Sequence, residues 1–131
     1  MADSTRARIL AVDDENDILL ILRTALKDDY DVSTAQSGPD ALAKMEEDIP
    51  DLVILDMMMP GMDGMKVLEA IRRNPNTATV PVIFLTGVTD RAKVREALDK
   101  GTSYYIVKPF THHDLMSKVG IALKEAQGAG F

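Results

Sequence analysis

Residues 10–17 read LAVDDEND, in which an apolar run is followed directly by four acidic side chains, Asp13, Asp14, Glu15 and Asp17. Carboxylates this close together repel one another, and each loses favourable hydration when it is partly buried. Two interpretations are open. Either the acids begin a solvated helix, where free backbone N–H groups favour negative charge, or they surround a cation.

This stretch joins the first of five short apolar segments to the first of five longer segments with helical periodicity. We expect strands at residues 8–12, 30–35, 51–56, 80–86 and 103–107. We expect helices at residues 16–27, 39–47, 64–73, 90–100 and 111–126. Five strand–helix units in succession predict an α/β fold with a parallel sheet that helices cover on both faces. The nearly continuous apolar runs DLVIL and VIFL are typical of strands buried on both sides.

Composition limits the classes of protein and of partner. The 131 residues suffice for one domain, and 46% hydrophobic with 27% charged residues is an ordinary globular composition. A net charge of −6 argues against nucleic-acid binding, which needs a basic patch. The absence of cysteine excludes disulfides and thiolate chemistry. Because no apolar run is long enough for a membrane span or a signal peptide, we expect a cytoplasmic protein without membrane contacts.

Polar side chains stand where several of the expected strands end. They are Asp13 and Asp14 after the first strand, Asp56 at the end of the third, Thr86 and Gly87 at the fourth, and Lys108 and Pro109 after the fifth. The carboxyl ends of parallel strands share one edge of a sheet, where such folds bind ligands. We therefore expect three carboxylates, one hydroxyl and one ammonium to converge. This set suits a hard divalent cation together with a phosphoryl group, with Asp56 available as a nucleophile.

The segments VDDEND, DMMMPGMDG, IFLTG and YYIVKPF resemble, in order and spacing, the motifs of response-regulator receiver domains of two-component systems, in the CheY-like superfamily. The resemblance covers about residues 7–125. It implies a flavodoxin-like, doubly wound (βα)5 fold whose five parallel strands have the order 2-1-3-4-5. It also implies a single receiver domain over residues 1–131, in which residues 126–131 are a tail or the start of a linker. No effector domain fits after residue 126, so we expect a stand-alone receiver or a module of a longer protein.

The resemblance implies a phosphoacceptor and a metal site. Asp56 would accept a phosphoryl group from the phosphohistidine of a sensor histidine kinase or a histidine phosphotransfer protein. Mg²⁺, for which Mn²⁺ could substitute, would be held by Asp14 directly, by Asp13 mainly through water, by Asp56, and by the backbone carbonyl of Met58. The chain would then be a phosphoacceptor regulatory domain, not an enzyme, and would assist only its own phosphorylation and dephosphorylation.

Further roles are implied around the phosphoryl group. It would be stabilised by Lys108, Thr86 and Gly87. The switch would be formed by Thr86 and Tyr105. The peptide bond before Pro109 would be cis, since cis bonds are costly except before proline.

The lifetime of the phosphoryl-aspartate is expected to depend on two positions. Met58 and Val88 lie two residues beyond Asp56 and Thr86, where the family tunes the access of hydrolytic water. Both side chains are apolar, which predicts a long-lived phosphoryl-aspartate.

The implied output surface comprises the fourth helix, the fifth strand and the fifth helix, and the segment RAKVREALDK supplies much of it. Through this surface a downstream protein target would bind, and the protein would be a monomer or a phosphorylation-dependent dimer.

Three other functions are alternatives to this switch. A degenerate receiver would act only as a protein-binding module. A Mg²⁺-dependent aspartyl phosphatase needs a second acid two residues after its nucleophile, where this chain has Met58. A flavodoxin-like electron carrier needs a hydroxyl- and glycine-rich phosphate loop after the first strand, where this chain has DDEND.

Some residues have a simpler structural interpretation. We expect Glu15 and Asp17 to begin the first helix and Asp63 to cap the third. His112 and His113 are adjacent on a helix and do not face each other, so we expect exposed first-turn residues and not a metal pair.

Overall fold

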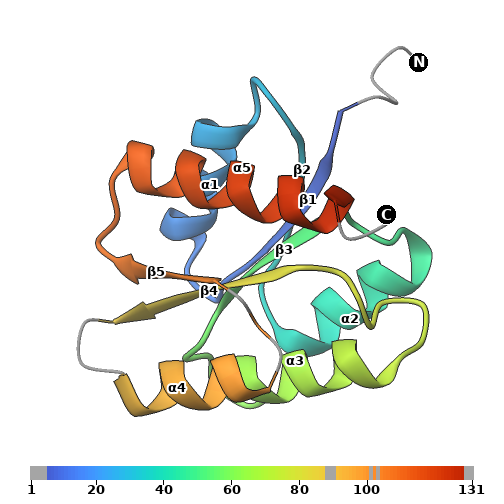
Figure 1. The fold of residues 1–131 in the computed structure, drawn as a ribbon. Helices are drawn as coiled ribbons and strands as arrows, with labels where there is room; N and C mark the ends of the chain where they lie inside the picture. Colours follow the sequence, from blue (N-terminus) through green and yellow to red (C-terminus); the bar gives the residue numbers. More distant parts are fainter. Residues whose placement is uncertain (1–5, 88–90, 101, 103, 129–131) are drawn as a thin grey trace.

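The computed structural model describes residues 6–87, 91–100, 102 and 104–128, which form a parallel sheet between two layers of helices (Figure 1). The strands are β1 (Arg8–Val12), β2 (Asp31–Ala35), β3 (Leu52–Asp56), β4 (Val82–Gly87) and β5 (Tyr104–Lys108). The helices are α1 (Asn16–Leu26), α2 (Gly38–Glu47), α3 (Gly64–Arg73), α4 (Arg91–Asp99) and α5 (His112–Gly128). None of the helices in the described part of the chain has the length and apolar character that a membrane span requires.

Every strand pair is parallel, and the order across the sheet is β2-β1-β3-β4-β5. The predicted doubly wound fold and its strand order are therefore confirmed. Helices α1 and α5 cover one face, and α2, α3 and α4 cover the other (Figure 1). Since the order reverses between β1 and β3, the carboxyl ends of these two strands border the crevice where such folds bind ligands.

The central strands are buried on both faces, as expected. All five residues of β3 are buried, and burial continues to Met57. Along the strand, Val53 and Leu55 contact the α2–α3–α4 layer, whereas Leu52 and Ile54 contact the α1–α5 layer. This alternation carries Asp56 to the edge of the sheet while leaving it only 3% exposed.

The bounds of β1 and α3 are as predicted, and the others agree to within two residues. Local hydrogen bonds explain two of the differences. Helix α2 begins at Gly38, before the proline, because the Ser37 side chain accepts the N–H of Asp40 and caps the helix. Strand β4 begins at Val82 because the N–H of Val80 donates to Thr77 in a preceding turn. Helix α5 continues to Gly128, two residues past its expected end.

Gly64, the first residue of α3, lies directly against the backbone that carries Asp56. A Cβ atom at this position would lie 2.6 Å from the carbonyl oxygen of Asp56 and 2.8 Å from Cα of Met57. It would also lie 2.8 Å from Cε1 of Phe84, which is fully buried in β4. The N–H of Gly64 donates to the carbonyl of Met57. Only glycine therefore lets the loop after β3 close back onto the strand end.

We expect Gly64→Ala to lower the free energy of unfolding by roughly 2 kcal/mol, because the methyl group meets backbone that cannot move without displacing Asp56. Gly120→Ala is the matched control: it lies inside α5, where a Cβ meets nothing within 4 Å, so helix propensity should stabilise it by about 0.5–1 kcal/mol. Thermal unfolding followed by circular dichroism measures both. Melting temperatures that shift alike in the two variants would contradict the close approach at Gly64.

Candidate functional site

Three carboxylates meet at the switch point of the sheet. Strands β1 and β3 are neighbours, with Val12 opposite Leu55, so the residues that follow come side by side. Asp13 and Asp56 are buried, Asp14 is exposed, and one oxygen of each lies within 4.8 Å of the others. The convergence predicted from the strand ends is therefore present in the structure for all three acids.

The backbone positions Asp13 between a strand and a helix. Its N–H donates to the carbonyl of Ala35 at 3.1 Å, which extends the pairing of β1 with β2 by one residue. Its Oδ1 accepts the N–H of Glu15 at 2.9 Å, where the chain turns into α1. The other oxygen, Oδ2, is buried and accepts no hydrogen bond from the described residues. The two oxygens of this carboxylate therefore differ in role: one holds the turn that leads into α1, and the other belongs to the acidic cluster.

Lys108, the last residue of β5, supplies the positive charge closest to the acids. Its Nζ donates to Oδ1 of Asp56 at 3.3 Å and lies 3.8 Å from Oδ2 of Asp13. The Lys108–Pro109 peptide bond is cis, as the resemblance implied. Within the described part of the chain, one ammonium faces three carboxylates, so the cluster keeps an excess of negative charge.

The excess charge and the burial perturb the proton equilibria of the two buried acids. Burial raises the pKa of Asp13 from 3.8 to about 6; the N–H of Glu15 and the Lys108 ammonium oppose this shift, and the carboxylates of Asp56 and Asp14 add to it. Burial also raises the pKa of Asp56, although Lys108 and the N–H of Met58 oppose the change. Both shifts mean that the site holds its negative charge at a cost in free energy.

A divalent cation such as Mg²⁺ fits this donor set. The candidate ligands are all carboxylate oxygens, which hard cations prefer, and they lie close enough together to share one ion. The buried Oδ2 of Asp13, which no hydrogen bond reaches from the described residues, gives the cluster an oxygen with spare coordinating capacity.

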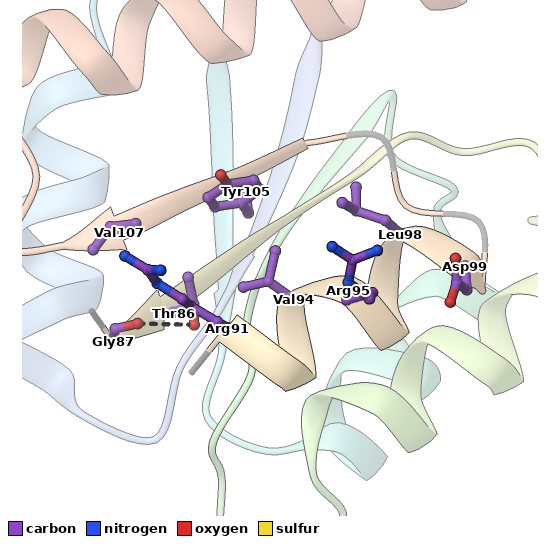
Figure 2. Close-up of a pocket in the computed structure, with 9 residues that line it drawn as sticks. All are labelled: Thr86, Gly87, Arg91, Val94, Arg95, Leu98, Asp99, Tyr105 and Val107. Carbon is purple, nitrogen blue, oxygen red and sulfur yellow. Dashed lines mark hydrogen bonds between the residues drawn. The ribbon is translucent and has the colours of Figure 1, made fainter. Parts of the chain in front are cut away.

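The predicted switch residues lie beside the cluster, at a groove between α4 and β5. Thr86 is 1% exposed, and its hydroxyl donates to the carbonyl of Gly87 at 3.3 Å (Figure 2). Tyr105 is 40% exposed and lines the same groove.

The two predicted tuning positions can be placed only in part. The Met58 side chain is 53% exposed, and its N–H lies 3.4 Å from Oδ1 of Asp56. Val88 lies outside the described residues.

The simpler interpretations of nearby polar residues are confirmed. Asp63 accepts the N–H of Lys66 at 3.1 Å and caps α3. Glu15 occupies the N-cap position of α1, and Asp17 lies in its first turn. His112 and His113 are exposed at the start of α5.

Two features of the structure are absent from the predictions. The Ser37 cap was missed, although a serine just before Gly-Pro is a recognisable signal for the start of a helix. The close approach of Gly64 has no signal in a single sequence, since it depends on how the loop returns to β3.

A five-stranded parallel sheet with an acidic cluster and a lysine at its switch point defines a regulatory receiver of two-component signalling. The family model for the response regulator receiver domain matches residues 9–120, and the chain belongs to this family of phosphorylation-dependent signalling switches.

Known proteins with similar sequences and structures are also response regulators. The chain is 40% identical over 114 residues to the response regulator PleD of Caulobacter vibrioides, covering 86% of this chain and 25% of PleD. It is 37% identical over 123 residues to the DNA-binding response regulator MtrA of Mycobacterium tuberculosis, covering 93% of this chain and 53% of MtrA. The chemotaxis response regulator CheY4 of Vibrio cholerae superposes with a TM-score of 0.85 at 34% identity, over 90% of this chain and 99% of CheY4. The chain thus spans about a quarter of PleD and half of MtrA.

The raised pKa of Asp13 predicts a pH-dependent loss of stability in the metal-free protein. Because the folded-state pKa, about 6, exceeds the ordinary value of 3.8, the folded protein binds an extra proton between these pH values. The contribution of this carboxyl to stability therefore falls as the pH rises from about 4 to 6 and stays low above that. Asp13→Asn removes the buried charge, so its advantage over the parent should grow across this interval, towards roughly 2 kcal/mol at neutral pH.

Thermal unfolding in a metal chelator, at pH values from about 4 to 7.5, measures this difference. Asp14→Asn is the control, because it removes an exposed acid of the same cluster and relieves no buried charge. A stability difference between Asp13→Asn and the parent that is constant across the pH range would contradict the prediction.

Proposed function

We propose that the chain is a cytoplasmic, phosphoryl-accepting switch in which Asp56 takes a phosphoryl group from the phosphohistidine of a sensor histidine kinase or a histidine phosphotransfer protein. The observation that carries the proposal is the buried carboxylate of Asp56, held 3.3 Å from the Lys108 ammonium and beside an Asp13 oxygen that no described hydrogen bond reaches. In the proposed organisation, residues 1–131 are a single receiver domain with its core at about 7–125.

The chemistry of the proposed transfer follows from the charge at the site. An oxygen of ionised Asp56 forms the new P–O bond while the P–N bond of the phosphohistidine breaks, and the imidazole nitrogen keeps that electron pair. Lys108 favours the ionised form of Asp56 against the effect of burial. Its ammonium, now between Asp56 and Asp13, can then contact a phosphoryl oxygen without leaving the cluster.

The proposed cation is Mg²⁺, or Mn²⁺ in its place, held by Asp13, Asp14, Asp56 and the Met58 carbonyl. When bound, it supplies positive charge that neutralises the phosphoryl oxygens during transfer. Asp13 and Asp14 are then positioning residues for the cation, and the orientation of Asp13 is maintained by its bond to the N–H of Glu15.

The proposed switch uses Thr86, Gly87 and Tyr105. In the structure the Thr86 hydroxyl is directed at the Gly87 carbonyl, and reorientation towards a phosphoryl oxygen would alter the groove that both residues line with Tyr105. The consequence would be a changed surface on α4, β5 and α5 for a downstream protein, with the switch acting as a monomer or as a dimer formed on phosphorylation.

The proposed domain is a regulatory phosphoacceptor that assists only its own phosphorylation and dephosphorylation. The phosphatase alternative needs an acid where the chain carries Met58, whose side chain is apolar and 53% exposed. An apolar side chain here cannot position a hydrolytic water, which supports a long-lived phosphoryl-aspartate.

Incubation with Mg²⁺ and acetyl phosphate should give one adduct of about 80 Da, the mass of a phosphoryl group, in intact-protein mass spectrometry. Asp56→Asn should abolish the adduct, because an amide oxygen is a poor nucleophile. Asp63→Asn is the matched control: it changes a nearby acid but keeps a side chain that caps α3, so its adduct should match the parent.

An absence of adduct on the parent chain under all conditions would overturn the proposal and leave a protein-binding module. After removal of acetyl phosphate the label should persist for minutes or longer. Loss of the label within seconds would contradict only the role proposed for Met58, and not the phosphorylation of Asp56.

Millimolar Mg²⁺ should raise the melting temperature of the parent protein, because an ion that binds only the folded state stabilises it by mass action. The effect should be much smaller in Asp13→Asn, which lacks one of the buried carboxylates. Calorimetry with and without Mg²⁺ measures it, and Asp51→Asn, which changes an exposed acid just before β3, should retain the full shift. A melting temperature that is indifferent to Mg²⁺ would contradict the metal site.

A further inference from the structure

The groove between α4 and β5 has a volume of about 600 Å³ and begins at the proposed switch (Figure 2). Thr86 and Gly87 form one end of it, and Leu98 and Asp99 near the C-terminal end of α4 form the other. It is therefore a surface whose shape depends on the residues next to the phosphoacceptor.

The rim of this groove is cationic, although the protein as a whole carries a net charge of −6. Arg91 and Arg95 are exposed on α4, one helical turn apart, and both line the groove. Neither makes a hydrogen bond or ion pair within the parts of the chain that the structure describes. Unpaired guanidinium groups at the edge of a groove are available to a carboxylate-bearing partner.

A third cationic side chain, that of Lys118, lies next to Tyr105. The Nζ of Lys118, on α5, donates to the carbonyl of Tyr105 at 3.2 Å and lies 5.8 Å from the centre of its ring. Tyr105 is thus flanked by arginines from α4 and by a lysine from α5. Among the described residues that line the groove, Asp99 is the only acid, and it lies at the end away from Thr86.

The floor and walls of the groove are apolar. Val94 and Leu98 project from α4 towards β5, where Val107 and Tyr105 face them (Figure 2). Leu98 is 44% exposed and Tyr105 is 40% exposed, so two large side chains remain partly uncovered here. Exposed apolar surface with a polar rim is characteristic of a protein-binding site.

We infer that this groove binds an acidic, amphipathic segment of the partner protein, with apolar side chains between Leu98 and Tyr105 and carboxylates against Arg91 and Arg95. The inference rests on the proposed function, which places the output surface here, and adds the chemistry of the partner. The charges also orient the segment: the carboxylate that meets Arg91 lies at the Thr86 end of the groove, and no acid of the segment faces Asp99.

Charge decides between this occupant and a second copy of the chain. A two-fold dimer through the same groove would bring twice as many arginines as aspartates into one interface, which leaves cations unpaired. An acidic segment pairs both arginines and leaves Asp99 at the rim.

The test uses fluorescence anisotropy with three labelled peptides. The acidic probe has leucines at positions i, i+3 and i+7 with glutamate and glutamine elsewhere, a pattern suited to a helix in a groove. The basic probe replaces glutamate by lysine, and the third probe replaces leucine by serine. We expect the acidic probe to bind about tenfold more tightly than either of the others at low salt, with the difference reduced as salt is added.

Two pairs of variants locate the binding. Arg91→Glu with Arg95→Glu should weaken the acidic probe about tenfold, and Leu98→Ser should weaken it several-fold. The controls lie across the sheet, on α1 and at the residue that caps its C-terminus. Arg23→Glu with Lys27→Glu makes the same change of charge, and Ile21→Ser removes an apolar side chain that is 50% exposed. These controls should leave binding nearly unchanged.

Three results would overturn the inference: equal or tighter binding of the basic probe, indifference to the arginine substitutions, or sedimentation showing a dimer that the same substitutions abolish. The measurements are made on the unmodified protein and after acetyl phosphate treatment, with the adduct quantified by mass. Charge preference in the unmodified protein tests the groove, whereas a change on phosphorylation tests its link to Asp56. If Asp56 accepts no phosphoryl group, the proposed function fails while the charge comparison still decides the inference.

Discussion

The burial of a negative charge at the end of β3 is the constraint on which the rest of this structure depends. Asp56 is the last residue of a strand that is buried along its whole length, so its carboxylate has little water to solvate it. Among the described residues, a single ammonium, that of Lys108, compensates this charge, and a second buried acid, Asp13, lies beside it. A site that is short of positive charge in this way gains free energy from a divalent cation, and its nucleophile is held next to the groups that would stabilise a phosphoryl anion.

The fold supplies this arrangement through the strand order. Because β1 and β3 are neighbours, the residues after Val12 and Leu55 come side by side, and because β4 joins β3 to β5, Lys108 reaches the same edge. The other oxygen of Asp13 accepts the N–H of Glu15, the N-cap residue of the helix that starts at Asn16. The four acids of LAVDDEND therefore have two roles, which the backbone decides. Asp13 and Asp14 belong to the acidic cluster, whereas Glu15 and Asp17 lie at the start of α1.

Much of this could be predicted from the sequence, since polar residues at the ends of apolar runs are visible without a structure. Asp13, Asp56 and Lys108 stand out because charge is rare next to fully buried strands, and parallel strands bring their carboxyl ends together. The rest depends on packing. That Arg91 and Arg95 border a groove follows from which side of α4 faces β5, and helical periodicity does not decide this for a helix with a single buried residue, Ala97, among those described.

The same pairing of strands explains why a change at Asp56 is expected to reach α4 and β5 before the α1–α5 layer. In β4, Leu85 pairs with Asp56, Thr86 pairs with Val107, and Gly87 pairs with the site lysine, so one short strand end contacts both the acid and the groove. Helix α4 lies over this strand end and is held by few apolar contacts, whereas α1 buries three leucines against the opposite face. A small displacement at the end of β4 is therefore expected to shift α4 more easily than α1. Helix α4 also carries Arg91 and Arg95, so the helix with few apolar contacts is the one that borders the groove for which we infer an acidic partner.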